Sequence, residues 1–217
     1  MDRRTFLEST VVLAAASAFP GMALAKDQTV VLPAPNMTGG KPLYEALAQR
    51  ATGRAFAPEP LGAQTLSNIL WAAFGINRPD QGRRTAPSAK NWQETDIYAA
   101  TADGLYLYEA KGHSLRLILD KDVRALAGKQ DFVATAPLDL IYVVDTTRSD
   151  SQGSADNTLL SWADTGFIAQ NVYLACASEG LTTVVRANID KPALAAAMKL
   201  NDKQFITLSQ TVGKPKA

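Results

Sequence analysis

Cysteine and histidine are almost absent from this chain, which has 217 residues and one of each. The single cysteine, Cys176, cannot form an internal disulfide, and its apolar neighbours are typical of a small core residue. His113 has no second histidine and no nearby cysteine with which to bind a transition metal, and the sequence contains no Gly-x-Ser-x-Gly turn. The sequence therefore argues against a metal site and a serine hydrolase, and we expect His113 to be a turn residue.

An excess of charge of one sign is also missing, because 22 Lys and Arg residues are balanced by 21 Asp and Glu residues. A nucleic-acid-binding domain usually carries a basic stripe. The net charge of +1 gives no support for a nucleic-acid partner. After residue 25 the sequence has no internal repeat and no apolar run long enough to cross a membrane.

Residues 1–25 have the organisation of an export signal. Arg3 and Arg4 precede an apolar run, and Ala23-Leu24-Ala25 fits the small-residue pattern of a cleavage site. The paired arginines and the following Thr-Phe-Leu resemble a twin-arginine signal. Acidic flanking residues depart from that pattern, so an ordinary secretory signal or an uncleaved anchor stays open. We therefore predict a periplasmic or exported protein with no stable membrane insertion after cleavage.

The rest of the chain is predicted to form one domain. Residues 26–40 are rich in Pro, Gly and Asn and are expected to form an extended arm with a short edge strand, and residues 41–217 form the domain itself. Hydrophobic periodicity predicts helices over 42–51, 61–73, 122–132, 159–179 and 191–199, and strands over 95–102, 104–108, 114–119, 138–144, 181–185 and 205–212.

A basic turn follows the first predicted helix, where Arg50 and Arg54 flank Thr52-Gly53. Guanidinium and backbone N–H groups at such a turn can converge on a phosphate. The same residues also fit a helix C-terminus that is closed by glycine and complemented by basic side chains. Spacing alone does not distinguish these two interpretations.

A polar stretch begins at Pro87-Ser88. We expect Ser88 to cap a helix N-terminus, so that the first turn holds Asn91 and Gln93 in a fixed direction. A carboxamide offers both a donor and an acceptor, which suits the edge of a flat heteroaromatic ring. A loop followed by a capped helix is common, so this stretch by itself indicates a ligand only weakly.

Several motifs, in order, resemble the nitroreductase-like flavoprotein superfamily. The first is the run Leu-Trp-Ala-Ala-Phe-Gly-Ile-Asn-Arg from Leu70, followed by Arg-Thr-Ala-Pro-Ser-Ala and Asn91-Trp-Gln. The others are Asp-x-Gly-x-x-x-Gln-Asn ending at Asn171, with Glu-Gly-Leu-x-Thr after it, and Val-Gly-x-Pro ending at Pro215. The similarity is closest to the branch that includes the peptide thiazoline and oxazoline dehydrogenases.

The resemblance implies an α+β fold, with a mainly antiparallel sheet flanked by helices, and a homodimer that binds one FMN per subunit at its interface. In such a protein Arg50, Arg54 and Lys214 would neutralise the phosphate, and Thr52, Ser88 and Asn91 would bind the ribityl chain and the ring. Backbone groups at Val185 and Arg186 would approach the reactive nitrogen of the flavin. Thr52 replaces the serine usual in the family but keeps a hydroxyl.

The resemblance also implies two-electron transfer by a nitroreductase-like or quinone-reductase-like enzyme, in which the flavin carries the chemistry. The electron donor would be NAD(P)H or, for an exported enzyme, a quinol or a redox protein. An azoline-type dehydrogenase is the first alternative. A non-catalytic, exported small-molecule-binding protein is the second, because Ala51 lacks a side chain that family members often present to the cofactor.

Overall fold

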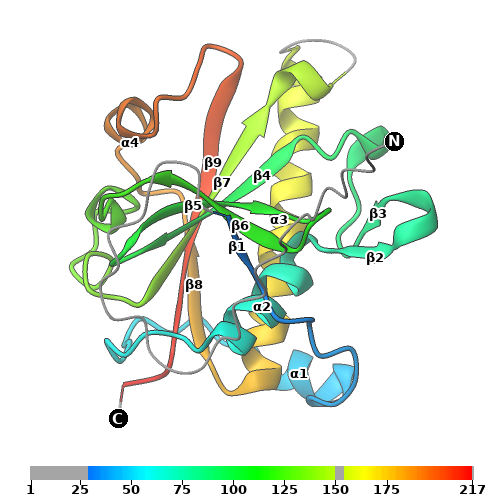
Figure 1. The fold of residues 1–217 in the computed structure, drawn as a ribbon, viewed down its shortest axis with the longest axis vertical. Coiled ribbons are helices and arrows are strands. Elements are labelled where there is room, and N and C mark those ends of the chain that lie inside the picture. The colour runs from blue at the N-terminus through cyan, green and yellow to red at the C-terminus, as the bar shows by residue number, and fades with distance from the viewer. Residues whose placement is uncertain (1–28, 150–153, 217) are drawn as a thin grey trace, which may run out of the picture.

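The computed structural model describes residues 29–149 and 154–216, which form an α+β fold (Figure 1). The predicted export signal lies outside the described residues. A seven-stranded sheet has the order β1-β6-β5-β4-β7-β9-β8, and its neighbouring strands are all antiparallel. These strands are β1 (Thr29–Val31), β4 (Thr95–Thr101), β5 (Gly104–Glu109), β6 (Ser114–Leu119), β7 (Leu138–Asp145), β8 (Thr182–Arg186) and β9 (Gln204–Gly213). The predicted fold class is confirmed.

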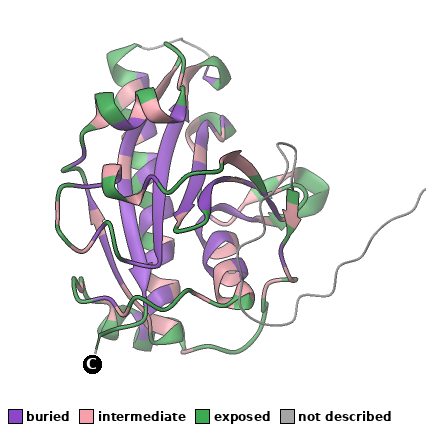
Figure 2. Cartoon of the chain, turned by 60° about the vertical axis from the view of Figure 1, so that its left-hand side comes forward, coloured by how far each residue is buried: buried purple, intermediate pink, exposed green. Residues whose placement is uncertain are grey.

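The two faces of the sheet are covered by different elements, because successive side chains on a strand point to opposite faces. Ile97, Leu140 and Tyr142 face a core layer formed with α2 (Ala63–Phe74) and α3 (Ala155–Glu179). Tyr98 and Ile141 face a second layer formed with α4 (Lys191–Met198) and the segment before β7. Buried residues are concentrated along the strands between these layers (Figure 2). The continuous apolar run of β7 is explained by burial on both faces.

The longest helix in the described residues, α3, is bounded at both ends by side-chain or backbone caps. The Ser154 hydroxyl accepts a hydrogen bond from the Asn157 N–H, and Gly180 ends the helix in the left-handed conformation. The helix packs against α2, against α1 (Leu43–Gln49) and against β8 (Figure 1). Within the described residues no helix has the length and apolar character needed to span a membrane.

The helix predicted over residues 122–132 is wrong, because only the 3-10 turn Arg124–Leu126 forms there. A helix would direct the carbonyl oxygen of Ala127 to a later N–H of its own segment. That oxygen instead accepts hydrogen bonds from Arg186 Nε (3.2 Å) and Ser209 Oγ (2.6 Å). A side chain at Gly128 would lie 2.3 Å from Arg186 Nε, so the segment must pass close to this arginine. Tertiary contacts thus override the local helical pattern.

The predicted edge strand in the arm is present as β1, which pairs with β6. His113 lies in the turn between β5 and β6, as expected, but its ring also fastens the arm to the core. Ser67 Oγ donates to the Pro33 carbonyl (2.6 Å) and lies 2.7 Å from His113 Nε2, while the Tyr108 hydroxyl lies 2.9 Å from Nδ1. Nε2 must therefore donate to Ser67, and Tyr108 must donate to Nδ1. Burial lowers the pKa of His113.

Candidate functional site

The basic turn lies against the C-terminal half of α3, and Tyr173 of that helix organises it. The Tyr173 hydroxyl is 3.0 Å from Thr52 Oγ1 and accepts a hydrogen bond from the backbone N–H of Val185 at 3.0 Å. The Arg50 guanidinium lies 5.4 Å from the centre of the Tyr173 ring. One side chain therefore connects three of the residues that the sequence predicts for cofactor binding.

Residues 50–54 are extended after α1 ends, so Arg50, Thr52 and Arg54 alternate with Ala51 and Gly53. Gly53 turns toward the protein, where its N–H donates to the Thr183 carbonyl (3.1 Å) and a side chain would meet Thr182. The odd-numbered residues 49, 51 and 53 line a hollow of about 240 Å³ beside Tyr173 and Cys176. Arg50 and Thr52 contact Tyr173 at the edge of this hollow.

The C-terminal segment adds a third cation to this group. Phe56 and Pro215 form an antiparallel bridge, the Ala57 N–H donates to the Lys214 carbonyl (2.9 Å) and the Lys216 N–H donates to the Ala55 carbonyl (3.1 Å). Lys214 is exposed beside the segment that carries Arg54. We call Arg50, Thr52, Arg54 and Lys214 the cation cluster.

The Arg186 side chain does not join the cation cluster. It is 6% exposed and donates to Asp139 Oδ1 (2.5 Å), to Thr211 Oγ1 (2.5 Å) and to the Ala127 carbonyl. Burial raises the pKa of Asp139 to about 6, although the Arg186 charge acts in the opposite direction. The Arg186 side chain is therefore part of the core, and only its backbone remains a candidate for contact with a cofactor.

Ser88 and Asn91 lie in a tight loop instead of the predicted capped helix. A single 3-10 turn, Ala89–Asn91, follows Ser88, and the Ser88 hydroxyl accepts from the Gln93 N–H (2.8 Å) instead of capping that turn. Lys90, Asn91 and Gln93 all have positive φ angles, of 47°, 59° and 50°. Such backbone conformations in residues other than glycine are strained, and a regular helix cannot contain them. The predicted N-cap is therefore wrong.

The strained loop is held by several side chains. Asp164 Oδ2 accepts from the Ala89 N–H (2.7 Å), and the Gln93 amide bonds Arg84 Nε (2.7 Å) and the Gly82 carbonyl (3.0 Å). Arg148 donates to the Gln93 carbonyl at 3.0 Å. Arg84 is the last residue of the small hairpin formed by β2 (Ile76–Arg78) and β3 (Arg83–Arg84). We call residues 88–93 the amide loop.

Two buried carboxyl groups lie beneath the amide loop. Glu94 is fully buried and Asp164 is 4% exposed. The Ser88 hydroxyl donates to Glu94 Oε2 at 3.3 Å, and Oε1 of Glu94 has no partner in the described residues. Burial and the adjacent Glu94 raise the pKa of Asp164 to about 6.

The cation cluster and the amide loop do not meet within one chain. They contact α3 at Tyr173 and Asp164 respectively, nine positions apart. Because an α-helix rises 1.5 Å per residue, these contact points are about 14 Å apart along the helix. A ligand smaller than that separation cannot touch both groups of one subunit.

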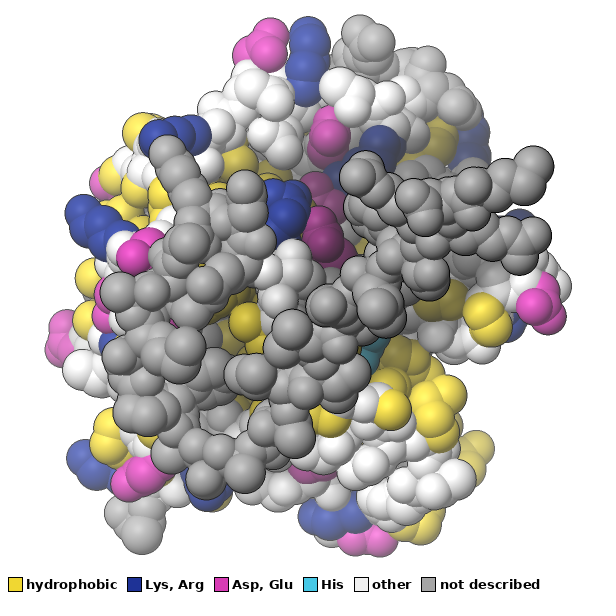
Figure 3. Space-filling view, viewed as in Figure 1, with side chains coloured by type: hydrophobic (Ala, Val, Ile, Leu, Met, Phe, Trp, Pro, Cys, Tyr) yellow, Lys and Arg dark blue, Asp and Glu magenta, His cyan; other side chains and the backbone are white. Residues whose placement is uncertain are grey.

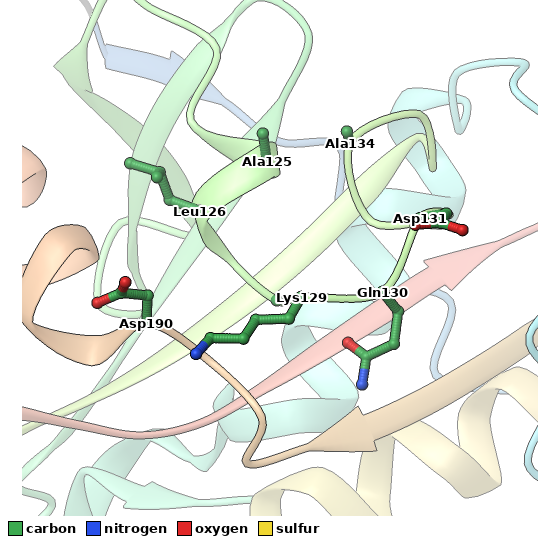
Figure 4. Close-up of a pocket in the computed structure, with 8 residues that line it drawn as sticks. Ala125, Leu126, Lys129, Gln130, Asp131, Ala134 and Asp190 are labelled. Atoms are coloured by element: carbon green, nitrogen blue, oxygen red, sulfur yellow. The ribbon is translucent and has the colours of Figure 1, made fainter.

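A second hollow, of about 550 Å³, lies on the opposite side of the sheet from α3 (Figure 4). It is lined by residues 125–134 and by Asp190 at the start of α4, with the Lys129 side chain extended toward Asp190. It contains none of the residues predicted for cofactor binding. On the surface shown in Figure 3, basic and acidic side chains are interspersed, in agreement with the balanced charge.

Comparison with known proteins identifies the family. Residues 47–214 match the Nitroreductase family. The chain belongs to this family. A putative nitroreductase of Methanocaldococcus jannaschii is 36% identical over 182 residues, which are 79% of this chain and 90% of the relative. The crystal structure of a putative nitroreductase from Ralstonia eutropha superposes with a TM-score of 0.83 at 41% identity and covers 87% of this chain and 90% of that one.

More distant members share the fold. The NADPH:FMN oxidoreductase of Vibrio harveyi, solved in complex with NAD⁺, superposes with a TM-score of 0.62 at 21% identity and covers 81% of this chain and 69% of that one. The family membership makes the chain a nitroreductase-family oxidoreductase.

Three residues of this nitroreductase-family site were not predicted from the sequence: Tyr173, Glu94 and Asp164. Asp164 belongs to the Asp-x-Gly-x-x-x-Gln-Asn motif, so its position was identified without its contact to the amide loop. Glu94 stands in the polar run Gln-Glu-Thr-Asp, which is typical of solvent-exposed sequence. Tyr173 has an apolar helical environment that predicts only a core residue, and nothing local indicates the two partners of its hydroxyl.

Proposed function

We propose that the protein is an FMN-dependent oxidoreductase that transfers electrons in pairs to nitro or quinone compounds. The observation that carries this proposal is the basic turn beside Tyr173, where Thr52 and Arg50 contact the tyrosine and where the segments that carry Arg54 and Lys214 are joined by backbone hydrogen bonds. A phosphate monoester carries up to two negative charges and three acceptor oxygens, which such a group can satisfy. The residues present therefore fit the phosphate and ribityl end of FMN.

The role of the chain is to bind and orient the cofactor. The flavin supplies the hydride chemistry when bound. Arg50, Arg54 and Lys214 would neutralise the phosphate, and Thr52 would bind the ribityl chain. The N–H of Val185 lies on an outer edge strand and donates to the Tyr173 hydroxyl, so it would bind the ring only by exchanging that acceptor for one on the cofactor.

The ring half of the site would come from the partner subunit, through Ser88 and Asn91. In a two-fold dimer with antiparallel α3 helices, position 164 of one helix lies beside position 173 of the other when the axis passes near their midpoint. The amide loop of one subunit would then lie beside the cation cluster of its partner. The two groups, which contact one α3 helix at points about 14 Å apart, would then be neighbours across the dimer interface.

The surface of α3 supports this dimer. Leu159 and Phe167 of α3 are 68% and 48% exposed, and Leu43 and Tyr44 of α1 are 61% and 83% exposed. Six of the eight exposed large apolar side chains in the described residues lie on these two helices, which contact each other. Apolar patches of this kind on one face usually mark a protein interface. Gly166, next to Phe167, has open space around its Cα, so another helix can approach closely.

The absorption spectrum of the purified protein tests the cofactor. We expect flavin bands, and FMN rather than FAD or riboflavin in the supernatant after denaturation. A colourless protein that remains colourless after incubation with FMN would overturn the proposal and favour a non-catalytic binding protein with this fold.

The double variant Arg50→Ala with Arg54→Ala tests the phosphate assignment. Loss of two charge-assisted contacts, each contributing about 1.5 to 3 kcal/mol, should weaken FMN binding at least 100-fold. The matched control Lys111→Ala with Lys121→Ala removes the same charge from exposed turns of the sheet and should bind FMN like the unmodified protein. Equal FMN affinity in all three proteins would sink the phosphate assignment, and titration calorimetry measures it.

Export remains a proposal that residues 1–25 alone support. An exported enzyme would meet little NAD(P)H, so a quinol or a redox protein is proposed as its electron donor. Cell fractionation decides the location, and anaerobic reduction of the bound flavin by NADH, NADPH or a quinol decides the donor. The narrower similarity to azoline dehydrogenases stays a prediction from the motifs.

A further inference from the structure

The carboxyl pair formed by Glu94 and Asp164 is not explained by cofactor binding alone. Both residues are buried, and the family site as proposed needs no acid or base. Leaving a buried carboxylate oxygen without a donor is costly, yet Glu94 Oε1 has none in the described residues. A proton can supply the missing donor.

The position of the pair favours such a proton. The two buried carboxyl groups contact neighbouring residues of the amide loop, Glu94 at the Ser88 hydroxyl and Asp164 at the Ala89 N–H. An ionised carboxyl group has only acceptors, so Asp164 can supply a donor to Glu94 only when it is protonated. The other oxygens are already occupied, since Asp164 Oδ2 accepts from the Ala89 N–H and Glu94 Oε2 accepts from the Ser88 hydroxyl.

The two arginines near the pair contact other groups. Arg148 pairs with Asp96 (2.7 Å) and with Asp145 (3.8 Å), and the Arg84 guanidinium bonds the Gln93 amide. Lys90 lies with its ammonium group 5.1 Å from the centre of the Trp92 ring. The Asp145 backbone N–H bonds the Glu94 carbonyl, not its carboxyl group.

We infer that Glu94 and Asp164 hold one proton between them and that this proton positions the amide loop for the cofactor. Both are therefore positioning residues, and the inference rests on the proposed function. With the proton in place, Asp164 fixes the Ala89 N–H and Glu94 orients the Ser88 hydroxyl. Ser88 then receives the Gln93 N–H and keeps one lone pair for a donor on the cofactor ring.

Loss of the proton would loosen the loop. Two adjacent carboxylates repel each other, and relief requires one of them to move away from its contact at Ala89 or Ser88. Those contacts hold the positive-φ residues Lys90, Asn91 and Gln93, whose conformations persist only when their surroundings enforce them. The affinity for the cofactor should therefore fall as the pH rises through the titration of Asp164.

Infrared spectroscopy of the protein without cofactor tests the proton itself. At about pH 5.5 the unmodified protein should show the C=O band of a protonated carboxyl group that is missing from Asp164→Asn and retained in Asp139→Asn, which removes the other buried carboxyl group with a raised pKa. The band should disappear at pH 8. An identical carboxyl band in the unmodified protein and in Asp164→Asn would overturn the inference, whether or not FMN binds.

The pH dependence of FMN affinity tests the positioning role. Asn at position 164 keeps an acceptor for the Ala89 N–H and donates permanently to Glu94, so Asp164→Asn imitates the protonated pair. Relative to this variant, the unmodified protein should bind FMN up to about tenfold more weakly for each pH unit above the titration, the limit for one proton. The affinity of the unmodified protein is divided by that of Asp164→Asn at each pH, because the FMN phosphate itself titrates near pH 6 and affects both proteins equally.

Asp103→Asn, in the exposed turn between β4 and β5, is the matched control and should show the pH dependence of the unmodified protein. Parallel pH profiles of the unmodified protein and of Asp164→Asn would overturn the positioning role. Absence of FMN binding in every protein would refute the proposed function and this role together, while the infrared result would still decide whether the pair holds a proton.

Discussion

At the scale of single residues, the Tyr173 hydroxyl is the contact that joins three parts of the chain. It bonds Thr52 after α1 and the Val185 N–H in β8, and it extends from α3. Tyr173→Phe removes both hydrogen bonds and leaves the Val185 N–H without an acceptor. We expect the free energy of unfolding, measured by urea denaturation, to fall by about 1 to 3 kcal/mol.

The matched control for Tyr173→Phe is Thr135→Val. Thr135 is exposed in the segment before β7, away from α1 and α3, so loss of its hydroxyl should change the stability by less than about 0.5 kcal/mol. Equal stability of the two variants would show that the Tyr173 hydroxyl does not fasten the basic turn.

The buried ion pair between Arg186 and Asp139 predicts a second effect at this scale. Arg186→Met leaves Asp139 buried without its cation, at a cost of about 3 to 5 kcal/mol near pH 8. The pKa of Asp139 is already raised to about 6 by burial, and removal of Arg186 raises it further. The native state of the variant then binds a proton that the unfolded state does not, so its free energy of unfolding recovers as the pH falls toward 5.

Arg116→Met is the control for Arg186→Met. Arg116 forms an ion pair with Glu109 at 2.6 Å on the surface, and both side chains are well exposed. Its loss should cost less than about 1 kcal/mol and change little with pH. Urea denaturation at pH 8 and pH 5 measures both variants, and a pH-independent loss in Arg186→Met would contradict the argument.

At the scale of elements, the exposed stripe of α3 predicts how assembly responds to substitution. Gly166→Arg places a long cation on the stripe between Leu159 and Phe167, where a side chain meets no atoms of its own subunit. We expect a folded monomer, because glycine is the poorer helix former by about 1 kcal/mol, and loss of FMN retention, because the proposed site takes residues from both subunits.

Light scattering after size-exclusion chromatography measures the oligomeric state of Gly166→Arg. Ala125→Arg, an exposed position on the opposite side of the sheet, is the control and should leave the dimer intact. A Gly166→Arg protein that is still dimeric would contradict the α3 interface.

The elements also show what sequence reasoning can and cannot reach. Helix α3 and strand β7 were predicted because their apolar residues form a long helical segment and a continuous buried run. A local signal also marks the end of α3, where Gly180 adopts the left-handed conformation. The segment 122–132 has an equally good helical pattern, yet Ala127 and Gly128 contact Arg186, which is far away in the sequence. Ser88 was similarly predicted to cap a helix, but Gln93 and Asp164 set its loop. Prediction from local sequence pattern is wrong where backbone N–H and carbonyl groups form hydrogen bonds with residues far away in the sequence.

At the scale of the whole molecule, the grouping of the candidate residues is harder to predict than their identity. Motif similarity indicated Arg50, Thr52 and Lys214, and the bridge between Phe56 and Pro215 joins the basic turn to the C-terminal segment. The same motifs indicated Ser88 and Asn91, whose loop contacts α3 nine positions from Tyr173. Contacts between segments so far apart in the chain cannot be read from spacing along it.

The position of β9 has a consequence for how the protein is made. It is the last strand in the described residues, yet it lies inside the sheet, between β7 and β8. While the ribosome still covers residues 204–213, β7 and β8 have open edges that can pair with other chains. We therefore expect the nascent chain to need protection until residues 204–213 have left the ribosome, after which one strand closes the sheet and joins the basic turn in the same step.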